Sequence, residues 1–300
     1  MSKAIEVRAL TYRAGKSFAI RDLDLNVPSG SIYGFLGPNG AGKTTTIRLL
    51  LGMTRPESGS IRLLGHEIPA GVHVALERIG YVPERPHLYP ALTVEEAMRC
   101  HASFFDRWDA TWATQLLRLF ELPLERKVGK LSKGETGKLM MLLALAQRPE
   151  LLILDEPTDG LDPMIRRDVL TALMDYVAQS GATVFISSHL VHELERMCDW
   201  VGVVDHGRLV TEARIETFKS GVKRIRLAEP EAVRVQEAPF TVLTRTRDAL
   251  APTETWVVRG WDDPMRDYFD TNGATVREVH DLDLEDVFVE LLRSSREKEQ

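Results

Sequence analysis

The segment Gly37-Pro-Asn-Gly-Ala-Gly-Lys-Thr44 carries the residue types of a phosphate-binding loop. Glycines let backbone N–H groups point at phosphate oxygens, because no β-carbon keeps the anion away. In this pattern Lys43 is expected to reach the β- and γ-phosphates of a nucleotide, and Thr44 to contact Mg²⁺. The positions expected at the nucleotide are Gly37, Pro38, Asn39, Gly40, Ala41, Gly42, Lys43, Thr44 and Thr45.

A second chemical feature is the pair Asp155-Glu156, which ends the apolar run 151–154. Charge at the end of a buried strand costs free energy unless something compensates it, and Mg²⁺ does so. Asp155 is then expected to hold the ion through its water shell, and Glu156 to polarise the water that attacks the γ-phosphate. The sequence therefore predicts ATP and Mg²⁺ as cofactors; the alternative is a strand that runs into a solvated acidic turn.

Strands and helices alternate around these two features, which predicts an α/β fold with a largely parallel sheet. The phosphate loop lies between an expected strand at 32–36 and an expected helix at 44–51, whose N-terminal dipole favours an anion. The expected strands are 5–10, 19–27, 32–36, 61–64, 151–154, 183–186 and 201–204, with a helix from Asp162-Pro163 to about 179.

Two other stretches differ in pattern from this core. Residues 93–147 are helical in pattern, with Thr93 and Glu96 spaced as a capping box, and are expected to form an inserted helical subdomain. After residue 220 short strands alternate and a helix follows, which predicts a small α+β domain over 221–300 beside a nucleotide-binding domain over 1–220.

Composition narrows the classes of function. The 300 residues carry 38 Lys and Arg against 44 Asp and Glu, a net charge of −6, which gives no electrostatic reason to expect a nucleic-acid partner. No apolar run approaches the roughly 18 residues of a membrane span, and no signal segment is apparent. Two cysteines fit a reducing compartment. We therefore expect a cytoplasmic chain that is not itself a membrane channel.

Five motifs together resemble those of ATP-binding cassette ATPases in order and spacing, over about residues 4–220. They are the phosphate loop, Leu131-Ser132-Lys133-Gly134-Glu135, Leu151–Glu156, Asp159-Gly160-Leu161-Asp162 and Ser188-His189. The resemblance implies a P-loop cassette with a mixed sheet core, an inserted helical subdomain and N-terminal antiparallel strands.

The same resemblance implies an ATPase that works as a dimer, most simply a homodimer, with two ATP molecules between the chains. Ser132 and Gly134 are then expected at the γ-phosphate bound to the other copy, and Asp162 is expected to cross the interface. His189 is expected to hold the γ-phosphate and the attacking water. A metal pair of His189 and His192 is the alternative, but Glu193 follows the second histidine rather than lying between the two.

The sequence departs from the family pattern in three places. Lys133 and Glu135 replace the usual glycine and glutamine, and their opposite charges are expected to offset each other. Glu84 replaces a glutamine that touches Mg²⁺, so it adds negative charge near the metal. The aromatic residue that stacks on adenine falls at Ala14 by family spacing, which leaves Tyr12 and Phe18 as candidates.

Most such cassettes power a transporter, so the resemblance implies a separate multi-span membrane partner and a place on the cytoplasmic face of the membrane. Glu84–Thr93 is the segment expected to meet that partner. The run Leu284–Phe288 matches a helix common in the export branch, which indicates an exporter; the alternative for this tail is an appendage that stabilises the dimer and is unrelated to the direction of transport. Two alternatives are a regulatory cassette with weak hydrolysis and a soluble cassette ATPase unrelated to transport.

Overall fold

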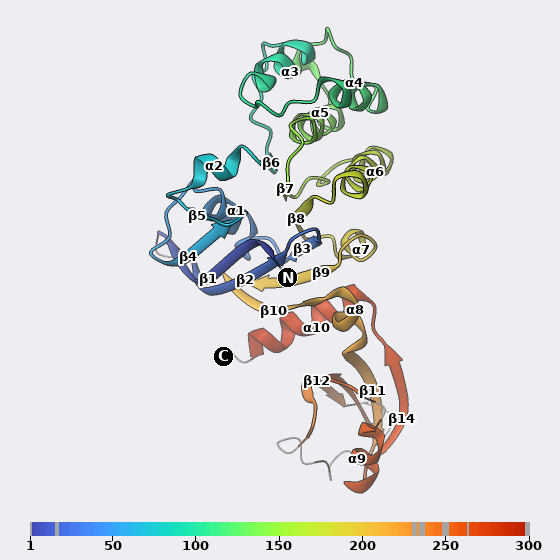
Figure 1. The fold of residues 1–300 in the computed structure, drawn as a ribbon. Helices are drawn as coiled ribbons and strands as arrows, with labels where there is room; N and C mark the ends of the chain where they lie inside the picture. Colours follow the sequence, from blue (N-terminus) through green and yellow to red (C-terminus); the bar gives the residue numbers. More distant parts are fainter. Residues whose placement is uncertain are drawn as a thin grey trace. The chain divides into compact units, whose positions relative to one another are not determined.

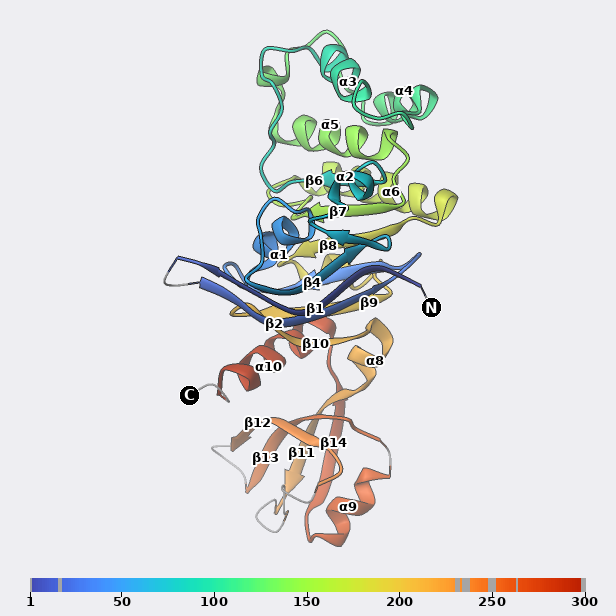
Figure 2. The ribbon, with the colours of Figure 1, turned by 60° about the vertical axis from the view of Figure 1, so that its left-hand side comes forward.

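The computed structural model describes residues 2–15, 18–229, 233, 238–247, 252–262 and 264–297 (Figures 1 and 2). The chain divides into two compact units. The first comprises Met1–His189 with Val204–Leu209, and the second Leu190–Val203 with Val210–Gln300. This division differs from the expected boundary at 220/221. The difference arises because the C-terminal helix packs on two short helices that precede that boundary.

A six-stranded sheet with the order β10-β9-β3-β8-β7-β6 forms the centre of the fold. The pairs β3–β8, β8–β7 and β7–β6 are parallel, as the sequence predicts. Every residue of β3, β7 and β8 is buried, which explains their continuous apolar runs. The strands are β3 (Ile32–Leu36), β6 (Ile79–Val82), β7 (Leu151–Asp155), β8 (Thr183–Ser188), β9 (Trp200–Asp205) and β10 (Arg208–Arg214).

A second sheet of the first unit is antiparallel and has the order β2-β1-β4-β5. Its first two strands extend beyond the expected ranges, because pairing continues through polar positions as far as Ala14 and Phe18. The helix α1 (Lys43–Leu50) contacts β4 and β7, so it lies between the two sheets. The strands are β1 (Lys3–Ala14), β2 (Phe18–Pro28), β4 (Ser58–Leu63) and β5 (His66–Ile68), and α2 (Val72–Leu76) follows them.

The helical subdomain expected over 93–147 contains α3 (Val94–Ala102), α4 (Ala110–Leu119) and α5 (Lys133–Ala146). Thr93 caps α3, and Glu96 completes the capping box that the sequence predicts. Most residues in the C-terminal half of α5, including Leu142, are buried. The helix α5 packs on α4, on β6 and on α6 (Pro163–Ser180). Asp162 caps α6, which ends at Gly181 in a left-handed conformation.

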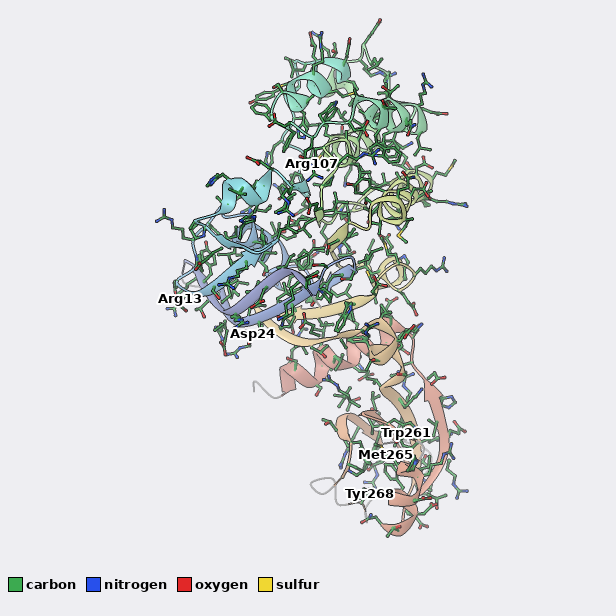
Figure 3. The ribbon with its side chains drawn as sticks, viewed as in Figure 1. Arg13, Asp24, Arg107, Trp261, Met265 and Tyr268 are labelled. Carbon is green, nitrogen blue, oxygen red and sulfur yellow. The ribbon has the colours of Figure 1, made fainter. Side chains whose placement is uncertain are left out.

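The second unit contains a four-stranded antiparallel sheet with the order β12-β13-β11-β14. One face carries an aromatic core in which Trp256 and Phe269 are fully buried, and Figure 3 shows Trp261, Met265 and Tyr268 gathered beside it. Its elements are α7 (Val191–Leu194), α8 (Ile215–Ser220), β11 (Val222–Ala228), β12 (Thr241–Arg247), β13 (Thr253–Arg259), α9 (Met265–Thr271), β14 (Thr275–Asp281) and α10 (Leu284–Glu297). No helix among the described residues is long and apolar enough to cross a bilayer.

Candidate active site

The loop between β3 and α1 has the backbone of a phosphate-binding loop. Gly40 and Gly42 have φ of 81° and 115°, a region that glycine adopts readily. Gly37 meets a different constraint, because a β-carbon there would lie 2.5 Å from the carbonyl oxygen of Val204. Glycine at these positions therefore permits both the turn and the close packing of the loop.

A cavity of about 450 Å³ opens at this loop and at the N-terminus of α1. The helix dipole and the free backbone N–H groups of that end favour an anion. The residues that line the cavity are Asn39, Gly40, Gly42, Lys43, Thr44, Thr45, Glu84, Glu156, Asp159 and His189. The structure thus brings the phosphate loop together with Glu84, Glu156 and His189, which lie far apart in sequence.

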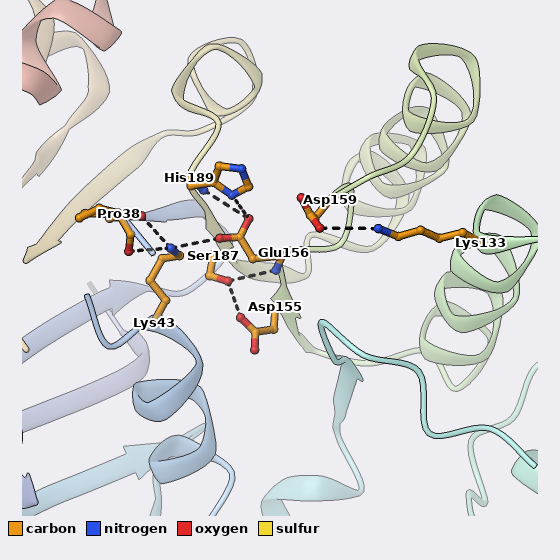
Figure 4. A network of polar contacts seen from close by, with 9 residues as sticks. Pro38, Lys43, Lys133, Asp155, Glu156, Asp159, Ser187 and His189 are labelled. Carbon is orange, nitrogen blue, oxygen red and sulfur yellow. Dashed lines mark hydrogen bonds and ion pairs between the residues drawn. The ribbon is translucent and has the colours of Figure 1, made fainter. Parts of the chain in front are cut away.

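Lys43 is the cation of this cavity, and its side chain is only 6% exposed. Its Nζ donates to the backbone oxygens of Gly37 at 2.6 Å and Pro38 at 3.2 Å. It also lies 3.1 Å from Oε1 of Glu156, as an ion pair rather than an aligned hydrogen bond (Figure 4). The ammonium group is therefore held by acceptors that a phosphate can replace.

Asp155 ends β7 and is fully buried. Its Oδ1 accepts a hydrogen bond of 2.7 Å from the hydroxyl of Ser187, whereas its Oδ2 is buried with no well-formed hydrogen bond to the described residues. Burial raises the pKa of this carboxyl, hydrogen bonds from Ser187 and Thr44 lower it, and the charges of Glu84 and Glu156 raise it again. A buried carboxylate oxygen without a well-formed hydrogen bond fits a Mg²⁺ site.

The described residues hold no cluster of three or more His, Cys, Asp or Glu side chains that suits a metal ion. In nucleotide sites Mg²⁺ is commonly held by one or two carboxylates together with substrate phosphates. Thr44, Asp155 and Glu84 are the residues of this chain that would hold it.

Glu156 follows Asp155 with φ of 48°, a left-handed conformation that is uncommon outside glycine. Its Oε2 lies 2.9 Å from Nδ1 of His189 and accepts a hydrogen bond of 3.3 Å from the backbone N–H of the same residue. The side chain is 10% exposed. Both carboxylate oxygens are thus turned toward the cavity, one at Lys43 and one at His189 (Figure 4).

Glu84 is exposed, lines the cavity and lies close enough to Asp155 for its charge to raise the pKa of that carboxyl. Burial, the largest cause, and the charges of Asp155 and Glu84 raise the pKa of Tyr81 to about 12, against the opposing charge of Arg48. Glu84 therefore adds a negative charge to a site where an anionic nucleotide is expected.

The N-terminus of α5 does not line the cavity of its own chain. Ser132 caps this helix in a capping box with Glu135. Lys133 lies 3.6 Å from Asp159 and Glu135 lies 2.7 Å from Arg126, so the expectation that Lys133 and Glu135 offset each other is wrong. Residues two apart on a helix face different sides, so each finds its partner elsewhere.

Gly134 and Asp162 also lie outside the cavity. A β-carbon at Gly134 would lie 2.2 Å from Cδ1 of Ile165, so this glycine lets α5 approach α6. Asp162 accepts hydrogen bonds of 3.1 Å from the backbone N–H groups of Met164 and Ile165. Within one chain, Gly134 therefore has a packing role and Asp162 a helix-capping role.

Neither Tyr12 nor Ala14 is among the residues that line the cavity. Both lie on β1, where Tyr12 pairs with Ile20 and Ala14 with Phe18. The side chain of Phe18 lies outside the described part of the structure. The residue that stacks on adenine stays a prediction among these three positions.

Ser187 is the site residue that the sequence reasoning missed. It is fully buried at the end of β8 and lies opposite Asp155 in the sheet register. The signal in the sequence is a hydroxyl near the end of a buried apolar strand, two residues before His189. That signal gains meaning only with the register, which places the hydroxyl between the Asp155 carboxylate and the backbone N–H of Glu156.

Comparison with known proteins shows which proteins this chain is similar to. The family model described as ABC transporter matches residues 20–159, and a second, described as "AAA domain, putative AbiEii toxin, Type IV TA system", matches residues 124–195. The chain is 34% identical to a bacitracin transport ATP-binding protein of Bacillus licheniformis, over 97% of this chain and 98% of that protein.

A Nod factor export ATP-binding protein I of Ralstonia nicotianae is 33% identical over 96% of this chain and 93% of its own length. Among solved structures, one described as the ATP binding subunit of an ABC transporter has a TM-score of 0.66 and 31% identity. It covers 72% of this chain and 92% of its own. These relatives extend along nearly the whole chain, whereas the structural match corresponds to about the length of the cassette.

Proposed function

This chain belongs to the ABC transporter family of ATP-binding proteins and is an ATPase, and we propose that two copies close around two ATP molecules to drive export through a separate membrane protein. One observation carries the proposal. Lys43, Glu84 and Glu156 line the cavity, but Ser132 and Gly134 lie outside it. A second copy that brings these two residues to the γ-phosphate would complete the site.

Binding starts at the phosphate loop. The N–H groups of the loop and of the N-terminus of α1 would surround the β- and γ-phosphates, and Lys43 would turn from Glu156 to the phosphate oxygens. Mg²⁺, held by Thr44, Asp155 and Glu84, would supply positive charge that neutralises the triphosphate. The chain's own part in this step is orientation of the nucleotide.

Hydrolysis needs a base and a group that holds the attacking water. Once Lys43 is drawn to the phosphates, Oε1 of Glu156 is available to accept a proton from water. Oε2 stays at the backbone N–H and Nδ1 of His189, which fixes the direction of the carboxylate. The opposite ring nitrogen of His189 would then approach the γ-phosphate.

The membrane partner would meet the exposed face of Glu84–Thr93. Tyr89 is 71% exposed in this segment, and Phe104 in the helical subdomain is 74% exposed. Aromatic side chains are enriched at protein interfaces. This would hold the chain at the cytoplasmic face of the membrane, and the names of the bacitracin and Nod factor relatives support export as the direction.

Affinity purification of the tagged chain from detergent-solubilised membranes of its own host tests the partner. We expect a multi-span protein to copurify, and Tyr89→Ser to reduce its recovery. Met53→Ser is the matched control, because Met53 is also exposed, at 59%, but lies outside this segment. A chain that stays in the soluble fraction with only itself, ribosomes or DNA would contradict the transport function and leave the ATPase.

A further inference from the structure

The hydroxyl of Ser187 connects the two acidic residues of the site. It donates a hydrogen bond of 2.7 Å to Oδ1 of Asp155 and accepts one of 3.1 Å from the backbone N–H of Glu156 (Figure 4). Ser187 is fully buried, so water does not replace either bond. A hydroxyl has one proton to donate, and these two bonds therefore fix both its direction and the relative position of the two residues.

The position of Ser187 follows from the pairing of β7 and β8. Asp155 lies opposite Ser187 in the parallel register, at the edge where the strands end. Glu156 then leaves the strand with its backbone N–H shared between the carbonyl oxygen of Ser187, at 3.2 Å, and the Ser187 hydroxyl. Ser187 thus holds Glu156, the first residue after β7, through two acceptors, its carbonyl oxygen and its hydroxyl.

This support matters because the Glu156 backbone is in the left-handed region, with φ of 48°. Such a conformation persists in a non-glycine residue only where its surroundings determine it. It turns the Glu156 side chain toward Lys43 and His189 instead of continuing the strand. Loss of one of the two acceptors would let this turn relax and would displace the carboxylate.

We propose that Ser187 is a positioning residue for ATP hydrolysis, which holds Asp155 in place for the metal and Glu156 in place for the water. The proposal rests on the function proposed above for Glu156. Ser187 itself touches neither nucleotide nor water in this scheme. Any effect of Ser187 on turnover is therefore exerted through the positions of Asp155 and Glu156.

The first arm of the test is turnover at saturating Mg²⁺. Ser187→Ala should lower kcat by about tenfold, as expected for a small displacement of a catalytic group, and leave the KM for ATP within about twofold. Ser187→Thr keeps the hydroxyl and should restore most of kcat. Thr183→Val is the matched control, because Thr183 is a buried hydroxyl on the same strand that accepts one backbone N–H, from Gly30, at the opposite end. It should leave kcat unchanged.

A double-mutant comparison separates positioning from general stability. In the Glu156→Gln background at saturating Mg²⁺, Ser187→Ala should change the residual single-turnover rate by less than about twofold, because the carboxylate that Ser187 positions for the water has already been replaced. An equal tenfold loss in both backgrounds would overturn the proposal, as would a full kcat in Ser187→Ala. Parental turnover in Glu156→Gln itself would instead overturn the function proposed for Glu156.

The second arm measures the metal without turnover. Fluorescent ATP is bound at increasing Mg²⁺, and the half-saturating Mg²⁺ concentration is recorded for each variant. Loss of a hydrogen bond that orients a metal ligand typically weakens metal binding at least tenfold, so we expect about a tenfold increase for Ser187→Ala and none for Thr183→Val. Equal values in Ser187→Ala and the parent would overturn the part of the proposal that concerns Asp155.

Discussion

Nζ of Lys43 lies 3.1 Å from Oε1 of Glu156, so the cation expected to bind phosphate is paired with the carboxylate expected to act on water. Both side chains are at most 10% exposed, and buried charges of this kind stabilise each other only as a pair. Bound ATP would attract the ammonium group of Lys43 away from the carboxylate of Glu156. Binding of the substrate would then free the base.

Lys43→Ala removes the cation that faces the phosphates. We expect nucleotide affinity to fall about 10- to 100-fold, the usual effect of losing a charge-assisted hydrogen bond. Binding of fluorescent ATP measures it, and Lys130→Ala, at an exposed lysine of the helical subdomain, is the control. Unchanged affinity in Lys43→Ala would rule out the phosphate-loop assignment.

Glu84→Gln removes one negative charge near Asp155. Without Mg²⁺, we expect the variant to bind ATP about three- to tenfold more tightly than the parent, because less negative charge opposes the triphosphate. The comparison is ATP binding in excess chelator, with Glu77→Gln at an exposed glutamate as the control. Equal affinity of parent and Glu84→Gln would mean that the Glu84 charge does not reach the nucleotide.

Glu150 connects the helical subdomain to the core. It accepts hydrogen bonds of 2.9 Å from Arg78 and 2.8 Å from Arg107, and these arginines, chiefly Arg78, lower its pKa to about 2. Glu150→Gln should reduce the free energy of unfolding at pH 7 by about 1 kcal/mol, since the pair is partly exposed to screening solvent.

The dependence of this effect on pH has a definite sign. The folded-state pKa of Glu150 lies below its ordinary value of 4.5, so the stabilisation is complete above pH 4.5 and is lost as the pH falls toward 2. Urea unfolding at pH 7, 4 and 3 should show the difference between parent and variant shrinking at each step. A constant difference would contradict the ion-pair explanation, and Glu125→Gln serves as an exposed control.

The centre of the fold and most of the site could be predicted because local sequence determines them. The apolar run 151–154 predicts a buried strand. The end of that strand determines where Asp155 and Glu156 lie. The glycines before Lys43 impose the loop. Glu84 and His189 could be assigned only through the family resemblance, and the structure brings both to the cavity.

The features that could not be predicted depend on contacts between distant segments. Ser187 meets Asp155 through strand register, which the sequence of one strand does not contain. Lys133 pairs with Asp159, from the loop before α6, only once α5 is in place. The division into two units likewise depends on α10 packing on α7 and α8.

The most direct test of the account is the mass of Glu156→Gln in solution with nucleotide. This variant should retain ATP while turnover falls about 10²- to 10⁴-fold, the usual contribution of a general base. By sedimentation we predict the mass of two copies with ATP and Mg²⁺ and of one copy with ADP, and Ser132→Ala should weaken the ATP-dependent pair. A single-copy mass while ATP is bound would contradict the proposal that two copies close around the nucleotide.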